Sequence, residues 1–146
     1  MSEREVAWYN NCFVCGPDNP TGLNLKFTFD GKTARTEYTP SHSHEGYKGI
    51  LHGGIIATIL DEVMIKAALA QEIMCVTAQM EIRYKAPAFL GKGLCFTAEV
   101  TEIKGRIIST AGKVSDSDGR ILAEATGKYM TVSQEMESKL QESLSE

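Results

Sequence analysis

The longest apolar segment of the chain spans residues 51–70, and its hydrophobic side chains would surround a helix rather than form one stripe along it. Because such a helix has no polar face to present to water, we expect it to lie at the centre of the molecule. Gly53 and Gly54 stand at its start, and Asp61 and Glu62 stand near its midpoint. An unpaired charge buried there would be costly or would shift its pKa. We therefore expect the functional site on this segment.

Alternating apolar and polar residues predict antiparallel strands before and after the central segment. Residues 23–29 and 33–39 alternate on either side of Asp30-Gly31, a pair typical of hairpin turns. After the helix, strands are expected at residues 74–84, 94–103, 107–115 and 121–132. Short turns join the last three, which predicts an antiparallel meander. The polar residues 133–146 predict a surface helix or a frayed tail.

One hydrophobic helix and about six antiparallel strands leave few arrangements, because the sheet must curve around the helix to bury it. The sequence therefore predicts an α+β protein with the hot-dog fold. We expect a single domain over residues 1–146, with a core at about residues 10–132 and a polar tail at 133–146. An α+β sandwich with the helix on one open face is the alternative. It would leave half of the helix in water, and that half is not polar.

Composition narrows the possible partners and location. The 146 residues are 42% hydrophobic and 23% charged, with a formal net charge of −4. An acidic chain of this kind argues against nucleic-acid binding, which usually requires a basic surface. The first residues lack the cationic start and apolar run of a signal peptide, and charges interrupt the longest apolar segment. We expect a cytoplasmic protein without a membrane partner.

The cysteines are too few and too scattered to predict a disulfide scaffold. Cys75 and Cys95 lie in strand-like apolar runs and are expected to be reduced core residues. The Cys12-x-x-Cys15 pair could belong to a zinc site or a redox motif. However, no second such pair completes a zinc site, and no helix follows, so a tight turn is the favoured interpretation. We expect no metal and no cofactor, and the loop histidines His42 and His44 are not expected to bind a metal with His52.

The start of the central helix has the properties of an oxyanion site. Backbone N–H groups in a first helical turn have no partner within the helix, and the helix dipole is positive there. The absence of side chains at Gly53 and Gly54 would let a substrate oxygen approach these groups. Alternatively, the two glycines only allow a tight bend from loop to helix.

Spacing along the helix distinguishes the two carboxylates. Glu62 has Lys66 four residues later, which is favourable for a surface or semi-exposed ion pair. Asp61 has no such partner and shares a face with small residues, so we predict that Asp61 is the catalytic carboxylate. The alternative is that a buried hydroxyl or a backbone donor satisfies Asp61.

The same spacing predicts an assembly. Eight helical residues separate Gly53 from Asp61 by about 12 Å along the axis, whereas a base and an oxyanion donor must both lie near the reacting group. One helix cannot supply both groups to one site. Two antiparallel helices from a pair of subunits can, so we expect a homodimer with two equivalent sites at the subunit interface.

Several motifs resemble those of one family. They are Cys12-Phe13-Val14-Cys15-Gly16, Asn19-Pro20-x-Gly22-Leu23, Gly46-Tyr47-Lys48-Gly49-Ile50-Leu51-His52-Gly53-Gly54, Asp61-Glu62 and Tyr84-Lys85-Ala86-Pro87. Together they resemble the hot-dog acyl-CoA thioesterases of the PaaI-like and 4-hydroxybenzoyl-CoA type, particularly the Them4-like subgroup. The similarity covers residues 10–132, and the His-Gly-Gly motif with a carboxylate nine residues after the histidine is its most specific part.

The resemblance implies an acyl-CoA thioesterase, which hydrolyses a thioester to a carboxylic acid and CoA. Asp61 matches the general base or nucleophile of the family, and Gly53 matches the amide that polarises the carbonyl. Thr77 matches a hydroxyl that orients the attacking water or the carboxylate. Whether such homodimers associate into a homotetramer, as a dimer of dimers, is left open at this point.

Other positions match the substrate-binding part of the family site. Arg83, Lys85 and Arg106 match residues that contact the CoA portion, as suits cations that face phosphates. His52 and Gly54 would flank the substrate, and His52 also fits a cap at the start of the helix.

One feature departs from the family pattern. Some relatives carry an asparagine shortly before the His-Gly-Gly motif, whereas this loop has Glu45, Gly46 and Tyr47. The oxyanion site would then depend on the Gly53 amide alone. Two other functions remain open at this point. One is a hot-dog hydratase or dehydratase, although its histidine motif is absent, and the other is a non-catalytic acyl-CoA-binding protein.

Overall fold

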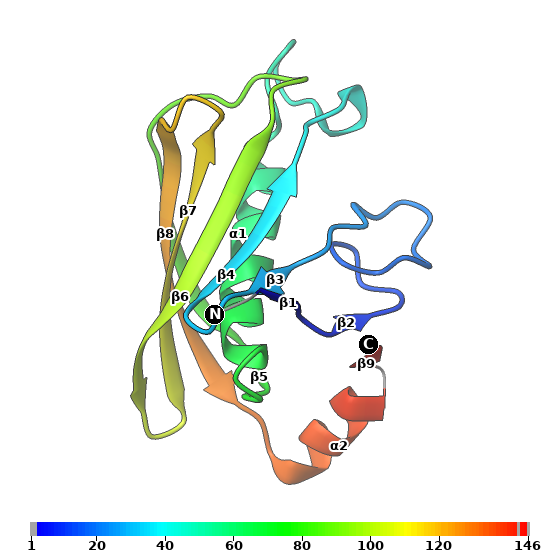
Figure 1. Cartoon of the computed structure of the whole chain (residues 1–146), viewed down its shortest axis with the longest axis vertical. Coiled ribbons are helices and arrows are strands. Elements are labelled where there is room, and N and C mark those ends of the chain that lie inside the picture. Colours follow the sequence, from blue (N-terminus) through cyan, green and yellow to red (C-terminus); the bar gives the residue numbers. More distant parts are fainter. Residues whose placement is uncertain (1–2, 143, 146) are drawn as a thin grey trace.

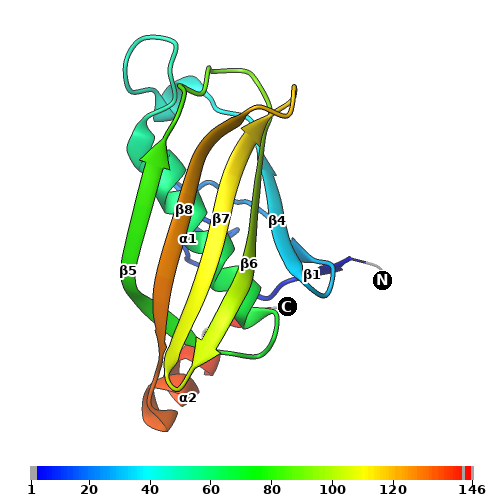
Figure 2. The same ribbon diagram turned by 90° about the vertical axis from the view of Figure 1, so that its left-hand side faces the viewer.

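The computed structural model describes residues 3–142 and 144–145. Seven strands form one antiparallel sheet in the order β1-β3-β4-β6-β7-β8-β5. The strands are β1 (Arg4–Glu5), β3 (Thr28–Phe29), β4 (Thr33–Tyr38), β5 (Cys75–Tyr84), β6 (Leu94–Lys104), β7 (Ile107–Asp116) and β8 (Ile121–Thr131). Figure 1 and Figure 2 show this sheet curving around one long helix, α1 (Gly53–Leu69). The predicted hot-dog fold is confirmed.

The helix α1 forms the centre of the hydrophobic core, as its apolar pattern predicted. Its fully buried hydrophobic side chains pack on the concave side of the sheet, and they are Ile56, Ile59, Leu60, Val63, Met64, Ala67 and Ala68. His52 precedes the helix with extended backbone angles. After the helix, Glu72 has a φ of 63° and turns the chain toward β5.

The four long strands agree with the predicted ones to within one or two residues at each end. The hairpin before the helix agrees in part, because β3 and β4 pair around Asp30-Gly31 as predicted but the first strand is shorter than expected. Residues 23–26 alternate as a strand would, but the N–H groups of Leu23 and Leu25 donate to the carbonyls of Phe13 and Val14. These carbonyls belong to the loop around the Cys-x-x-Cys motif, so the segment pairs with that loop and β3 is only two residues long.

The two ends of the chain form short elements outside the main sheet. The tail forms the surface helix α2 (Gln134–Glu142), which confirms one of the two expectations for it. Beyond it, β9 (Leu144–Ser145) pairs with β2 (Trp8–Tyr9) in a separate two-stranded sheet. Figure 1 shows β2 and β9 next to each other, to the right of α1. A short 3-10 helix, η1 (His42–His44), lies in the loop before α1. Throughout the described residues, no helix has the length and hydropathy needed to cross a membrane.

The strand β5 forms one edge of the sheet. It is ten residues long, and within the described part of the chain it pairs only with β8. Val76 and Tyr84 on this strand are 47% and 50% exposed, and Met80 and Ile82 are half-buried. A long edge strand with exposed apolar side chains is a surface that proteins usually cover.

A close contact inside the sheet depends on a glycine. A Cβ atom on Gly127 would lie 2.5 Å from a ring carbon of Tyr129 and 3.1 Å from the hydroxyl oxygen of Thr110. The Tyr129 side chain is fully buried between the sheet and α1. Gly127 therefore provides the space in which the Tyr129 ring turns toward the helix.

We expect Gly127→Ala to lower the free energy of unfolding by about 1–3 kcal/mol, the usual cost of overpacking a core. The matched control is Gly93→Ala, because a Cβ there would meet only Thr39, at 3.8 Å. That variant should stay within about 0.5 kcal/mol of the unchanged protein. Urea denaturation followed by circular dichroism measures both, and equal stability of the two variants would contradict the role given to Gly127.

Candidate functional site

Asp61 lies at the midpoint of α1, and two hydroxyl groups from the sheet hold its side chain. Thr77 Oγ1 of β5 and Tyr129 OH of β8 both donate to Asp61 Oδ1, each at 2.9 Å. The second oxygen, Oδ2, makes no hydrogen bond to any residue that the structure describes. The carboxylate is thus held in one orientation with one oxygen free, which is what a base or a nucleophile requires.

The spacing predicted only that Asp61 lacks an ion-pair partner, and no ion pair of Asp61 occurs among the described residues. The curved sheet instead brings two hydroxyls to it, and the family resemblance implied the first of them, that of Thr77. One of them is a buried hydroxyl, as in the alternative that the sequence left open. Burial and the adjacent Asp61 charge raise the pKa of Tyr129, so its hydroxyl stays protonated and keeps donating to Asp61.

Sequence reasoning did not identify Tyr129. A signal was present, because Tyr129 follows Gly127 by two residues and so lies on the same face of the strand. A large polar aromatic residue on the buried face needs a partner for its hydroxyl. The partner, Asp61, is 68 residues away in the chain, and no local sequence pattern indicates that the two residues pair.

The predicted pairing of Glu62 with Lys66 is present, but the pair does not lie at the surface. Lys66 is only 1% exposed, and the Glu62 side chain is 15% exposed. Lys66 Nζ lies 3.6 Å from Glu62 Oε2 and donates to the Ala7 carbonyl at 2.6 Å. The N-terminal segment covers this side of α1, which no helical periodicity could reveal. Desolvation, opposed only in part by Lys66, raises the pKa of Glu62 to about 7.

The start of α1 has the features expected of an oxyanion site. His52 caps the helix, because its Nδ1 accepts the N–H of Gly54 at 2.8 Å. The N–H groups of Ile55 and Ile56 donate to the His52 carbonyl. By contrast, the Gly53 N–H has no acceptor among the described residues. The predicted capping role of His52 is confirmed, and the one donor left over in this turn belongs to Gly53.

A pocket of about 770 Å³ lies beside Gly53. Its walls come from the loop before α1 and from the end of β5 with the residues that follow it, and they include Tyr47, Ile50, Tyr84 and Pro87. Tyr84 OH donates to the Gly53 carbonyl at 2.7 Å. Tyr84 was expected only as part of a motif, yet this hydrogen bond connects the edge strand to the start of the helix.

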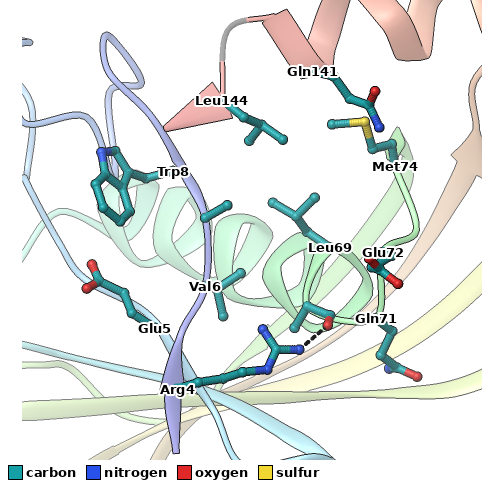
Figure 3. Close-up of a pocket in the computed structure, with 12 residues that line it drawn as sticks. Arg4, Glu5, Val6, Trp8, Leu69, Gln71, Glu72, Met74, Gln141 and Leu144 are labelled. Atoms are coloured by element: carbon teal, nitrogen blue, oxygen red, sulfur yellow. Dashed lines mark hydrogen bonds between the residues drawn. The ribbon is translucent and has the colours of Figure 1, made fainter. Parts of the chain in front are cut away.

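Asp61 does not line this pocket. The two halves of the predicted site therefore stay apart within one chain, about 12 Å along the helix axis. A second pocket, of about 1040 Å³, surrounds the other end of α1 and is lined by the N-terminal segment, Leu69 and the tail (Figure 3). Neither Asp61 nor Gly53 lines it.

The structure brings only two of the three predicted CoA-binding cations together. Arg83 lies opposite Glu124 in the sheet, and Lys85 forms an ion pair with Glu124. Both are near the Gly53 end of the molecule. Arg106 donates to the Thr131 carbonyl at 3.0 Å, at the opposite end of the strands.

One group of possible metal ligands occurs among the described residues. The ligand atoms of Cys12, Cys15 and Glu62 lie within 4.8 Å of one another. Lys66 Nζ is 3.4 Å from Cys15 Sγ as well as 3.6 Å from Glu62. Because this buried ammonium group already supplies the positive charge, we do not assign a metal site.

Comparison with known families agrees with this geometry. The family model described as the thioesterase superfamily matches residues 48–123, more than half of the chain. These residues include both Gly53 and Asp61. The chain belongs to the thioesterase superfamily.

Individual relatives are more distant. Acyl-coenzyme A thioesterase THEM4 of Xenopus laevis is 31% identical over 94 residues, which cover 64% of this chain and 42% of that protein. The crystal structure of a thioesterase superfamily protein superposes with a TM-score of 0.79 and 26% identity, covering 89% of this chain and 68% of that one. A hypothetical thioesterase of Streptococcus pneumoniae, solved with coenzyme A, gives a TM-score of 0.68 at 20% identity, covering 70% and 83%. The chain spans less than two thirds of the length of the curated relatives it matches.

The raised pKa of Glu62 predicts a pH-dependent stability. Between its ordinary pKa of 4.5 and about 7, the folded protein keeps a proton on Glu62 that the unfolded chain has released. This group therefore reduces stability as the pH rises through that window. In Glu62→Gln the effect is absent, so its free energy of unfolding should rise relative to the unchanged protein by up to about 3 kcal/mol from pH 4.5 to pH 7.5.

Urea denaturation at several pH values measures this difference. Glu135→Gln, at an exposed position of α2, controls for the loss of a carboxylate. A constant difference between Glu62→Gln and the unchanged protein across the window would show that Glu62 is not held in a desolvated position.

Proposed function

We propose that the protein is an acyl-CoA thioesterase with Asp61 as its catalytic carboxylate. The observation that carries this proposal is the geometry of Asp61, whose Oδ1 is held by Thr77 and Tyr129 while Oδ2 is free. Membership of the thioesterase superfamily, and a relative named acyl-coenzyme A thioesterase, support hydrolysis of an acyl-CoA thioester as the reaction.

Each part of the site has a role in this reaction. The Gly53 N–H would donate to the thioester carbonyl and stabilise the oxyanion that forms on it. Asp61 Oδ2 would either remove a proton from the attacking water or attack the carbonyl itself to form a transient anhydride. Thr77 and Tyr129 would keep the carboxylate oriented in either case. The products are a carboxylic acid and CoA.

The separation of Gly53 from Asp61 supports a homodimer with shared sites. The exposed edge of β5 offers a surface for a second copy, and two edge strands related by a twofold axis pair in antiparallel fashion. Thr77 contacts Asp61, so it gives the position of Asp61 along β5. Tyr84 contacts Gly53 and gives the position of Gly53 along the same strand. Pairing Thr77 with Tyr84 of the partner subunit places the axis between Met80 and Glu81. Each Asp61 is then level with Gly53 of the partner subunit.

The same arrangement would also bring the three predicted CoA-binding cations close to one another. Arg106 lies at the Asp61 side of the strands, near the start of β5, whereas Arg83 and Lys85 lie near its end. In the antiparallel pair, Arg106 of the partner subunit comes toward Arg83 and Lys85. A CoA phosphate group could then face all three, although one chain alone keeps them apart. Such dimers could associate further into a dimer of dimers.

We expect Asp61→Asn to lower the turnover of acyl-CoA by at least about a hundredfold, the low end for loss of a general base. Glu62→Gln is the matched control, because Glu62 points to the N-terminal segment and should affect turnover far less. Release of free thiol from a panel of acyl-CoA substrates measures both. Equal losses in the two variants, or full activity in Asp61→Asn, would contradict the assignment. Tight acyl-CoA binding without turnover by the unchanged protein would show a binding protein instead.

A further inference from the structure

A second cluster of reactive groups lies outside the proposed thioesterase site, on a different face of α1 from Asp61. It contains Cys12 and Cys15 from the N-terminal loop and Glu62 and Lys66 from α1. Glu62 follows Asp61 by one residue, a rotation of about 100° around the helix, so it faces a different neighbour. The proposed hydrolysis uses none of these four side chains.

The loop holds the two cysteines in a tight turn. The N–H groups of Val14 and Cys15 both donate to Cys12 Sγ, each at 3.4 Å, and the Gly16 N–H donates to the Cys12 carbonyl at 2.9 Å. A Cβ on Gly16 would lie 2.4 Å from backbone atoms of Asn10 and Cys12, so only glycine permits this turn. The turn brings the two sulfur atoms within 4.8 Å of each other.

The two sulfur atoms have different surroundings. Cys12 is partly exposed, whereas Cys15 is 4% exposed and lies against Lys66. Both cysteines are free thiols. A partly exposed cysteine next to a buried one is the arrangement in which the first attacks an external disulfide and the second resolves the product.

The charges of the cluster depend on one another. The ammonium group of Lys66 is buried and needs a negative partner, which either Glu62 or a cysteine sulfur can supply. Glu62 Oε2 is 3.8 Å from Cys12 Sγ, so the two groups repel each other when both are charged. The groups that face Cys12 are Cys15 from its own turn, Glu62 and Lys66 from α1, and Tyr9 from β2.

The pKa shifts agree with this arrangement. Hydrogen bonds from the Cys15 thiol and the two backbone N–H groups, with the Lys66 charge, lower the pKa of Cys12 to about 5. The pKa of Cys15 shifts in the opposite direction, because its hydrogen bond to Cys12 and its burial both raise it. The pair therefore holds one thiolate and one thiol near neutral pH.

We propose that Cys12 and Cys15 form a redox-active dithiol that small-molecule disulfides convert to an intramolecular disulfide. The Cys12 thiolate attacks one sulfur of the small disulfide, forms a mixed disulfide with it and expels one small thiolate. Cys15 then loses its proton to solvent or to Glu62 and attacks Cys12 Sγ, which expels the second small thiolate. Two cysteine thiols become one disulfide, and the two electrons and two protons end on two molecules of small thiol.

Alkylation of the reduced, folded chain with iodoacetamide at pH 6, analysed by mass spectrometry for each cysteine, tests the first half of this proposal. Cys95 is the internal control, because it is also half-buried and burial raises its pKa. We expect Cys12 to react at least about tenfold faster than Cys95. Equal rates at the two cysteines would overturn the proposal.

Incubation with glutathione disulfide tests the second half. The unchanged chain should lose two thiols and contain a Cys12–Cys15 bond, Cys15→Ser should retain one glutathionyl group on Cys12, and Cys12→Ser should form neither product. Cys95→Ser should behave like the unchanged chain. If both thiols stay free, or if Cys15→Ser gains no adduct, the pair is not redox-active. A tightly bound metal in the native mass spectrum would likewise overturn the proposal. These readouts do not depend on the thioesterase activity.

Discussion

The constraint on which the structure depends is that α1 is apolar on nearly all sides yet carries three charged residues along its length. The sheet must cover the helix to bury its hydrophobic side chains, and every charged group must then find a partner inside that cover. Asp61 receives two hydroxyl groups from β5 and β8. Glu62 and Lys66 find each other and the N-terminal loop. The two clusters that carry chemistry are thus consequences of burying one helix.

This constraint explains why periodicity predicted the architecture well. The central helix and the four strands after it have strong, local patterns, and all appear close to their predicted positions. The segment before the helix has an equally clear alternation, but Leu23 and Leu25 pair with the carbonyls of a loop instead of a strand. Alternation shows which face of an extended segment is buried and does not show what its backbone bonds to.

Residue spacing could predict the site only where its members share one element. Thr77 of β5, which donates to Asp61, was expected only from the family resemblance. Asp61, Gly53 and the His52 cap lie on or beside α1, so their spacing was informative. Tyr129, Tyr84 and Cys15 contact the helix or its start from other parts of the chain, and their contacts depend on how the sheet and the loop fold back. The same limit explains the error over Lys66, since helical spacing indicates its nearness to Glu62 but not the segment that covers both.

The central claim is that one active site uses Asp61 of one subunit and Gly53 of the other, and subunit complementation tests it most directly. Gly53→Pro removes the N–H donor, and the extended backbone of His52, with φ of −60° and ψ of 130°, tolerates a following proline. Light scattering must first show that Gly53→Pro and Asp61→Asn both assemble and exchange subunits. In an equal mixture, half of the dimers are mixed and each has one intact site, so thioesterase activity should return to about a quarter of the unchanged level. Activity no higher than that of the separate variants, with exchange demonstrated, would contradict the shared site.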